Sequence, residues 1–270
     1  MVYPPFLSTG SDKPTPISIL GSDLSFWLAS TMGVFNRAGG PSTDTDDVKD
    51  WVDSGPNAQD FTQAIEASQA TFAANILNGY PGILFDGTDD YMKRASAFLT
   101  GESGAIFIVS QLVVAGGTDR AFYFGSSAED SVLQYSQVFV HDHNNSREAL
   151  QYMRINIGDA STLVVLATDT TIVADVPYIH VWRSTGTASK IRINGNEETI
   201  DLGGSTVDGD WFADVEDPVN VTLGAKEDTG ISVPSNTYIF EVVGVDGVDL
   251  SLAKIEELER YFADKYGVVI

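Results

Sequence analysis

Short apolar segments separated by polar turns recur along almost the whole chain, and this pattern predicts a protein built mainly of β-strands. Residues 105–114 are almost continuously apolar, which is typical of a strand buried on both faces. Residues 152–157 instead alternate, with Met153, Ile155 and Ile157 on one face. Further strands are predicted at 24–29, 48–53, 83–85, 120–125, 132–140, 162–167, 178–183, 190–193, 219–224 and 237–245. Residues 58–74, rich in Ala and Gln, are predicted to form an irregular loop.

Two turns are marked by their own chemistry. Asn194-Gly195 follows an alternating segment and predicts a two-residue β-hairpin turn, because both positions tolerate a positive φ. Asp86-Gly87 interrupts the central stretch 78–94 in the same way, since Asp bonds its own backbone and Gly accepts the left-handed conformation.

One helix is predicted, near the end of the chain. Ser251 stands at the N-cap position and Gly267 just past the last turn. Ile255, Leu258 and Phe262 lie between them at helical spacing, with charged residues on the other faces. A dozen strands and one helix favour an all-β fold, an antiparallel sandwich of two sheets closed by a short C-terminal helix.

The first twenty residues differ from the rest in composition. They contain four of the ten prolines, separated by Ser, Thr and Gly. Because proline removes a backbone donor, the segment is predicted to be extended and unable to form a helix or a central strand. We therefore divide the chain into a Pro-rich N-terminal arm, residues 1–20, and a single β domain, residues 21–270.

Composition narrows the classes of partner. The formal net charge of −23 excludes nucleic acid and an anionic membrane surface, and favours a partner that is neutral or basic. The 26 Asp and 12 Glu suit a loop-rich β protein, because Asp favours turns. The absence of cysteine excludes disulfides and thiolate chemistry. Neither a secretory signal nor an apolar run long enough to cross a bilayer is visible.

The order of several short motifs resembles the concanavalin A-like (laminin G-like) jelly-roll domains of bacteriophage virion proteins, in tails, fibres and capsid-associated components, and of bacterial surface proteins. The resemblance covers residues 21–270. It is carried by LSFWLA at 24–29, VKDWVDSG at 48–55 with Gln63, NILNGYPGILFDGTDDYM at 75–92, INGN at 193–196, Leu223-Gly224, and FEVVG at 240–244 leading into the helix.

This resemblance implies a non-enzymatic structural or adhesion protein of a tailed-phage virion. The arm would attach the jelly roll to other virion proteins, and the loops would face outward toward a host-surface glycan. The protein would assemble in the host cytoplasm without a signal peptide, with a homo-oligomer as one option. The leading alternative is a carbohydrate-binding module on a virion or cell surface, and the third is a glycan-cleaving enzyme.

No catalytic residues are predicted, and no ligand-binding residue is assigned. The Glu-x-Asp-x-x-Glu arrangement of sandwich glucanases is missing, Glu241 is alone in its strand, and no serine elbow occurs. Trp27 and Trp51 are predicted to pack in the core and His180 to be structural. His141 and His143 could pair on a metal if extended, but a solvated loop is favoured. No cofactor is predicted, with calcium as the one alternative: the resemblance implies that calcium can bind at a rim, as in laminin G-like relatives, and the candidate ligands are Asp86, Asp89 and Asp90.

Overall fold

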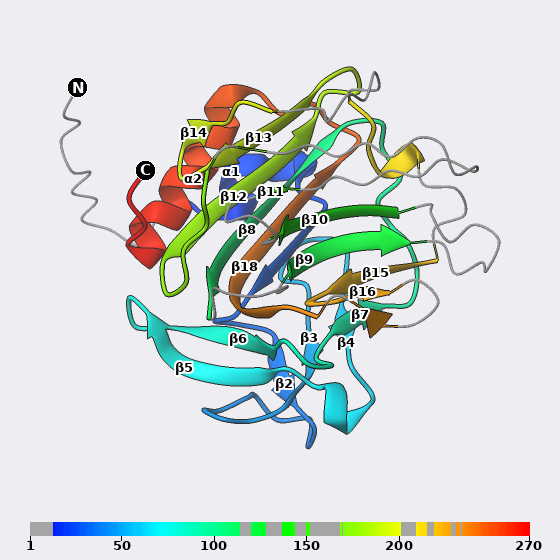
Figure 1. The fold of residues 1–270 in the computed structure, drawn as a ribbon, viewed down its shortest axis with the longest axis vertical. Helices are drawn as coiled ribbons and strands as arrows, with labels where there is room; N and C mark the ends of the chain where they lie inside the picture. Colours follow the sequence, from blue (N-terminus) through cyan, green and yellow to red (C-terminus); the bar gives the residue numbers. More distant parts are fainter. Residues whose placement is uncertain are drawn as a thin grey trace.

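The computed structural model describes residues 13–113, 120–127, 137–143, 150–151, 168, 170–200, 209–214, 219–227, 231–232 and 234–270. Their strands form two large antiparallel sheets, with the longer of two helices near the C-terminus, so the predicted two-sheet sandwich is confirmed (Figure 1). A separate hairpin pairs β16 (Lys226–Glu227) with β17 (Ile231–Ser232).

Sheet A is centred on two long apolar strands, β8 (Gly104–Leu112) and β18 (Asn236–Asp246), which pair over their whole length. On one side of β8 lie β12 (Pro177–Ser184), β13 (Ser189–Ile193) and β14 (Asn196–Glu197). On the other side of β18 lie β1 (Phe26–Ala29), β6 (Tyr80–Asp86) and, beyond β6, β5 (Thr71–Leu77). Asn194 and Gly195 have φ of 46° and 79°, so the predicted hairpin turn between β13 and β14 is confirmed.

Sheet B brings together strands that are far apart in the sequence. Its order is β11-β10-β9-β15-β7-β4-β3-β2. The bounds are β2 (Val34–Asn36), β3 (Val48–Trp51), β4 (Phe61–Thr62), β7 (Met92–Arg94), β9 (Arg120–Ser127), β10 (Gln137–His143), β11 (Leu150–Gln151) and β15 (Asn220–Leu223). The predicted strands at 152–157 and 162–167 lie outside the described residues.

Two apolar clusters make the molecule three layers deep. The first lies between the sheets and joins Phe26, Ile108 and Val242 of sheet A to Trp51 and Phe124 of sheet B. The second lies on the other face of sheet A, where helices α1 (Pro16–Leu20) and α2 (Leu252–Tyr266) cover it. Figure 1 shows both helices on the side of sheet A away from β9, β10 and β15. Sheet A is therefore buried on both faces, as the apolar segment 105–114 predicts.

Helix α2 is the predicted C-terminal helix, with the predicted ends. Ser251 is its N-cap residue, and Gly267 closes it in the left-handed conformation with a φ of 71°. Ile255, Leu258 and Phe262 are fully buried against sheet A. By burial of area, each contributes about 1.5–3 kcal/mol to docking of the helix.

The N-terminal segment corrects one expectation. Pro16–Leu20 is a helix, although the proline content predicted that residues 1–20 could not form one. Proline fits the first turn of a helix, and Thr15 caps this one through a capping box with Ser18. Ile19 and Leu20 are buried in the second cluster, so among the described residues the folded unit begins before residue 21. Residues 1–12 lie outside the described residues, and the arm stays a prediction there.

Residues 58–74 also differ from the prediction of an irregular loop. Phe61–Thr62 is strand β4, Glu66–Ser68 is a turn of 3-10 helix (η2), and β5 begins at Thr71. Strand β4 forms because Phe61 is fully buried and pairs with Trp51, a contact between strands that the local composition does not signal. Within the described part of the chain, no helix is both long and apolar enough to span a bilayer.

Candidate functional site

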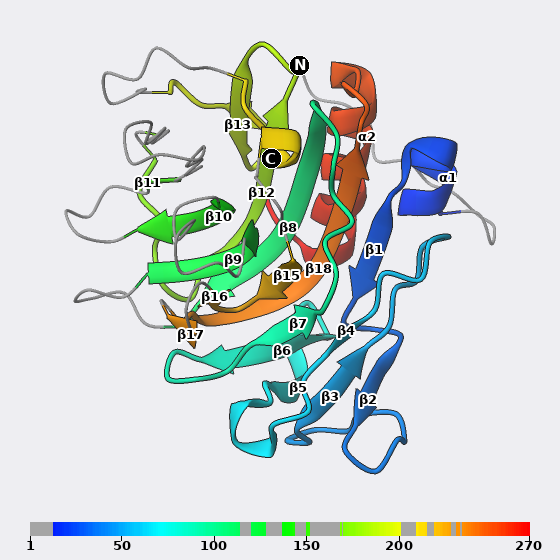
Figure 2. The same cartoon turned by 90° about the vertical axis from the view of Figure 1, so that its right-hand side faces the viewer.

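Among the described residues, neither apolar cluster includes side chains from the outer face of sheet B. Sheet A has a cluster on each side, and the inner face of sheet B supplies Trp51, Phe61, Met92 and Leu223 to the first cluster. Because side chains alternate along a strand, the residues next to these four point away from the core. Figure 2 shows β9 and β10 of sheet B on the side of β8 and β18 away from α2. A ligand for this fold would therefore meet this face first.

Strand register places six of the outward-pointing residues in one line across sheet B. Phe35 of β2 pairs with Asp50 of β3, Asp50 with Thr62 of β4, and Thr62 with Lys93 of β7. Lys93 in turn pairs with Thr222 of β15, which pairs with Gly125 of β9. We call this line the outer-face row: Phe35, Asp50, Thr62, Lys93, Thr222 and Gly125.

The row is open at one end and covered at the other. Thr62 is exposed, and Phe35, Asp50 and Lys93 are partly exposed. Thr222 is only 2% exposed although it points away from the core. The accessible part therefore runs from Phe35 to Lys93, which is three inter-strand spacings, or about 14 Å. That length accommodates a short chain molecule better than a single small group.

Polar contacts hold the side chain of Asp50 in the middle of the row. The Thr62 hydroxyl donates to Asp50 Oδ1 at 2.7 Å, and Lys49 Nζ lies 3.9 Å from Asp50 Oδ2. The exposed part thus offers an apolar ring, a carboxylate held by its neighbours, a hydroxyl and an ammonium. An aromatic ring with a few fixed polar groups is the usual composition of a ligand site. Alternating donors and acceptors suit a ligand rich in hydroxyl groups.

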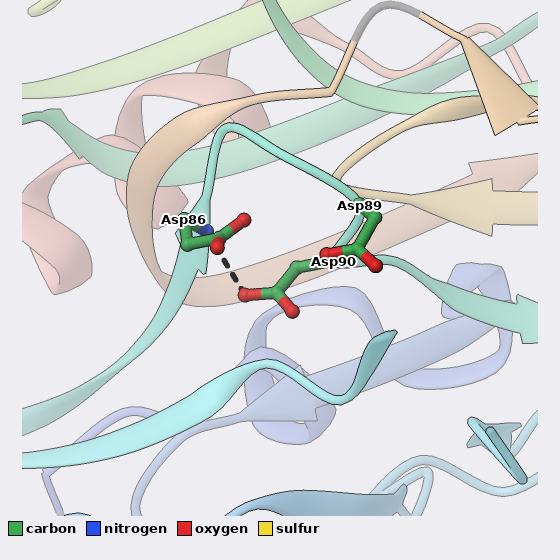
Figure 3. A group of neighbouring side chains, drawn as sticks. All are labelled: Asp86, Asp89 and Asp90. Atoms are coloured by element: carbon green, nitrogen blue, oxygen red, sulfur yellow. Dashed lines mark hydrogen bonds between the residues drawn. The ribbon is translucent and has the colours of Figure 1, made fainter. Parts of the chain in front are cut away.

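The predicted calcium ligands converge at the turn that leads into β7. One carboxylate oxygen from each of Asp86, Asp89 and Asp90 lies within 4.8 Å of the others. Figure 3 shows the three side chains gathered at this turn; Asp86 and Asp89 are exposed, whereas Asp90 is 6% exposed. The turn is held by its own bonds: the Asp86 amide donates to Asp90 Oδ2 at 3.0 Å, and the Thr88 amide to Asp86 Oδ1 at 2.7 Å. Three carboxylates at this spacing match the oxygen ligands that calcium prefers.

Burial gives Asp90 an unusual proton affinity. Desolvation raises its pKa from 3.8 to about 7, and the neighbouring charges of Asp86, Asp89 and Asp47 add to the rise. The hydrogen bond from the Asp86 amide acts in the opposite direction and lowers the pKa of Asp90. At neutral pH Asp90 therefore lies near its titration midpoint. A cation bound at this turn would displace the proton.

The pH dependence of stability tests this assignment. Because the pKa of Asp90 is raised in the folded state, its protonated form contributes stability that is fully present below pH 3.8 and is lost as the pH rises through 7. Asp90→Asn should therefore unfold at higher denaturant than the parent at pH 8 in EDTA, by about 1 kcal/mol or more, with the difference vanishing at low pH. Asp89→Asn, at an exposed site, is the control. A variant less stable than the parent at pH 8 would show that the ionised carboxylate is structurally bonded.

Calcium removal is expected to lower the melting temperature by only a few degrees. The two apolar clusters and α2 do not involve the turn, so the fold does not depend on an ion there. The measurement is a melting series in EDTA and in excess calcium, with Asp90→Asn beside the parent. A fall of tens of degrees, absent in the variant, would make the three aspartates structural ligands.

The other candidate residues are structural where they are described. Trp27 and Trp51 are buried, as predicted. His180 is fully buried and stacks on Trp182, with 5.2 Å between the ring centroids. Burial lowers the pKa of His180 to about 3. Glu241 is 0% exposed beneath α2, so no substrate reaches it. His141 and His143 lie in strand β10, in place of the favoured loop, but their side chains are outside the described residues.

Sequence reasoning did not identify the outer-face row. Phe35, Asp50, Thr62 and Lys93 are separated by up to 58 positions and share no motif. The alternation around Trp51 could have marked Asp50 as an outward residue. The pairing of β4 with β7, which aligns Thr62 with Lys93, has no signal in the local sequence.

Comparison with known proteins shows the fold but no family. No protein-family model matches the chain, and no curated protein matches it in sequence. A sialidase of Trypanosoma rangeli in complex with 2,3-difluoro-KDN is similar over 94% of this chain and 36% of its own, with a TM-score of 0.56 at 12% identity. A mutant NanB sialidase of Streptococcus pneumoniae is similar over 65% and 27%, with a TM-score of 0.52 at 11% identity.

A carbohydrate-binding module gives a weaker likeness. The CBM40 of a Ruminococcus gnavus sialidase, bound to α2,3-sialyllactose, is similar over 59% of this chain and 83% of its own at 14% identity. Its TM-score of 0.49 is too low to establish a shared fold.

These likenesses correct the expectation that the protein is not an enzyme. The two sialidases reported above are enzymes that share the fold, so the fold is no argument against glycan cleavage. The chain spans about a third of the length of the trypanosomal sialidase. Nothing in the comparisons points to a phage virion. What they establish is a β-sandwich of a kind that occurs in glycan-active proteins.

Proposed function

We propose that this chain is a glycan-binding β-sandwich whose ligand lies along the outer-face row, from Phe35 to Lys93. The observation that carries the proposal is the register of sheet B, which lines up an aromatic ring, a carboxylate, a hydroxyl and an ammonium on the accessible part of its outer face. The occurrence of the fold in sialidases supports a glycan as the ligand.

The physical case rests on what a sugar presents. A pyranose has an apolar face of C–H groups and an equator of hydroxyls that both donate and accept hydrogen bonds. Phe35 can stack on the apolar face. The Asp50 carboxylate accepts from hydroxyls, Lys93 donates to them, and Thr62 does both. The Thr62–Asp50 bond holds two of these groups in place before a ligand arrives, which lowers the entropy lost on binding.

The wider setting remains a prediction from the resemblance of the motifs. In that setting the sandwich is part of a phage particle made in the host cytoplasm, attached to other virion proteins through the N-terminal residues and open to a host-surface glycan. Homo-oligomerisation belongs to the same prediction. Light scattering of the full chain and of a chain lacking residues 1–12 would test the role of these residues in assembly.

Glycan binding is tested with an array followed by titration of the best oligosaccharide. Phe35→Ala should weaken binding about tenfold, as expected for about 1.4 kcal/mol of stacking, and Thr62→Val by a similar factor. Thr187→Val makes the same change at an exposed hairpin of sheet A and should bind like the parent. Released sugar is measured in the same samples, so that cleavage is detected with binding.

Two outcomes would contradict the proposal. The first is the absence of binding to every neutral and charged glycan on the array by a protein with a cooperative melting transition. The second is binding that Phe35→Ala and Thr62→Val leave unchanged, which would place the ligand elsewhere on the molecule.

A further inference from the structure

We infer that the outer-face row selects neutral glycans and rejects glycans that carry a carboxylate next to it. This inference rests on the proposed function and adds the charge class of the ligand. Its basis is the distribution of described charges on and around sheet B: a carboxylate stands inside the row, more carboxylates lie to one side of it where β3 and β7 begin, and the nearby guanidinium groups are engaged elsewhere.

Asp50 is the carboxylate inside the row. It stands between Phe35 and Thr62, in the accessible part, where a bound sugar would lie against it. Lys49 approaches it only to 3.9 Å, so this neighbour offsets the charge without forming a tight pair. A carboxylate on the ligand at this position would face a like charge at close range, whereas a hydroxyl would find an acceptor.

The strand directions place further aspartates to one side of the row, along the strands. Both β3 and β7 are antiparallel to β4, so these two strands run in the same direction and begin at the same end of sheet B. Asp46 and Asp47 directly precede β3. Asp86, Asp89 and Asp90 precede β7, and their carboxylates lie together. Asp50 and Lys93 are thus flanked by negative charge on the side where β3 and β7 begin, in a chain of net charge −23.

Arginine, whose planar fork matches a carboxylate, is turned away from the row where it is described. Arg94 follows Lys93 but points inward: its Nη1 donates to the Ala58 carbonyl at 3.3 Å, and its guanidinium lies over the Phe98 ring at 5.6 Å. Arg37, two residues beyond Phe35, is paired with Glu66. Among the described residues, the cations left beside the row are Lys49 and Lys93. They do not outweigh Asp50 together with the five aspartates that precede β3 and β7.

The test uses pairs of oligosaccharides that differ in the charge of their carboxyl groups: the methyl ester of α2,3-sialyllactose with α2,3-sialyllactose, and the methyl-esterified form of tetragalacturonate with tetragalacturonate. In each pair the neutral member should bind more tightly. Affinity for the charged member should rise as salt goes from about 0.01 M to about 0.15 M, because the Debye length falls from about 30 Å to about 8 Å. Asp50→Asn should raise the ratio of charged to neutral affinity about threefold, the factor for one unit charge at about 7 Å in water.

Asp249→Asn is the matched control. It removes a unit charge at an exposed position between β18 and α2, where Asp249 pairs with Arg183, far along the chain from the row, and should leave the ratio unchanged. Tighter binding of the charged members, weakening with salt, would overturn the inference while leaving the proposed function intact. A ratio that responds equally to both variants would also overturn it, because the effect would then come from net charge. If neither member of either pair binds, and no glycan on the array binds, the proposed function itself is contradicted.

Discussion

Lys265→Met is expected to lower the free energy of unfolding by about 3–5 kcal/mol, because it leaves the carboxylate of Glu241 buried without its cation. Lys265 Nζ lies 2.7 Å from Glu241 Oε2, and the two side chains are 12% and 0% exposed. Tyr266 donates to the same oxygen at 2.7 Å, and Tyr261 and Trp27 donate to the other at 2.9 and 2.5 Å. Four donors, three of them from α2, thus converge on one acid in β18.

The matched control lies on the same helix. Lys254 pairs with Asp23 at 2.6 Å, but the two side chains are 38% and 26% exposed, and Lys254→Met should change stability by less than about 1 kcal/mol. Urea unfolding at pH 7, followed by tryptophan fluorescence, measures both variants. Equal effects of the two substitutions would show that water reaches Glu241, and that apolar packing alone holds α2 to sheet A.

Gly224→Ala is expected to destabilise the protein by about 3–4 kcal/mol, the sum of a backbone term and a steric term. Gly224 has a φ of 80°, a conformation that costs about 1–2 kcal/mol for a residue with a Cβ. A Cβ there would also fall inside the ring of Phe85, which is fully buried in the first cluster. Because the core is close-packed, the ring cannot move away without displacing its neighbours.

Gly247→Ala separates the two terms. Gly247 has a φ of 74°, but no atom lies within 4 Å of the Cβ that alanine would add. This variant should lose about 1–2 kcal/mol, the backbone term alone. Thermal melting with chemical denaturation at one pH compares the two. Similar losses for both glycines would mean that Phe85 has room to shift, and that the constraint at Gly224 is conformational.

Local chemistry explains why several elements were predictable. The Asn194-Gly195 hairpin and the end of α2 at Gly267 depend on residues that accept a positive φ, which a sequence displays directly. The buried face of α2 follows from spacing alone. The convergence of Asp86, Asp89 and Asp90 is local in the same sense, because the three residues belong to one tight turn.

Elements that depend on partners distant in sequence were not predictable. Helix α1 forms despite the prolines of its segment because Ile19 and Leu20 are buried against sheet A and α2. Helix α2 lies more than 200 residues further along the chain. Strand β4 exists because Phe61 pairs with Trp51 and Thr62 with Lys93. The role of Glu241 was equally hidden, since its donors come from both ends of the chain.

By itself, the sequence determined that this protein is a two-sheet β-sandwich with a C-terminal helix and an acidic turn before β7, because alternation, capping and turn chemistry act over a few residues. The tertiary structure alone decided that, among the described residues, part of the outer face of sheet B is accessible, and that Phe35, Asp50, Thr62 and Lys93 form a line across it. The reason is register: in a sheet a shift of one residue turns every side chain to the opposite face, and register between distant strands is set by the packed core as a whole.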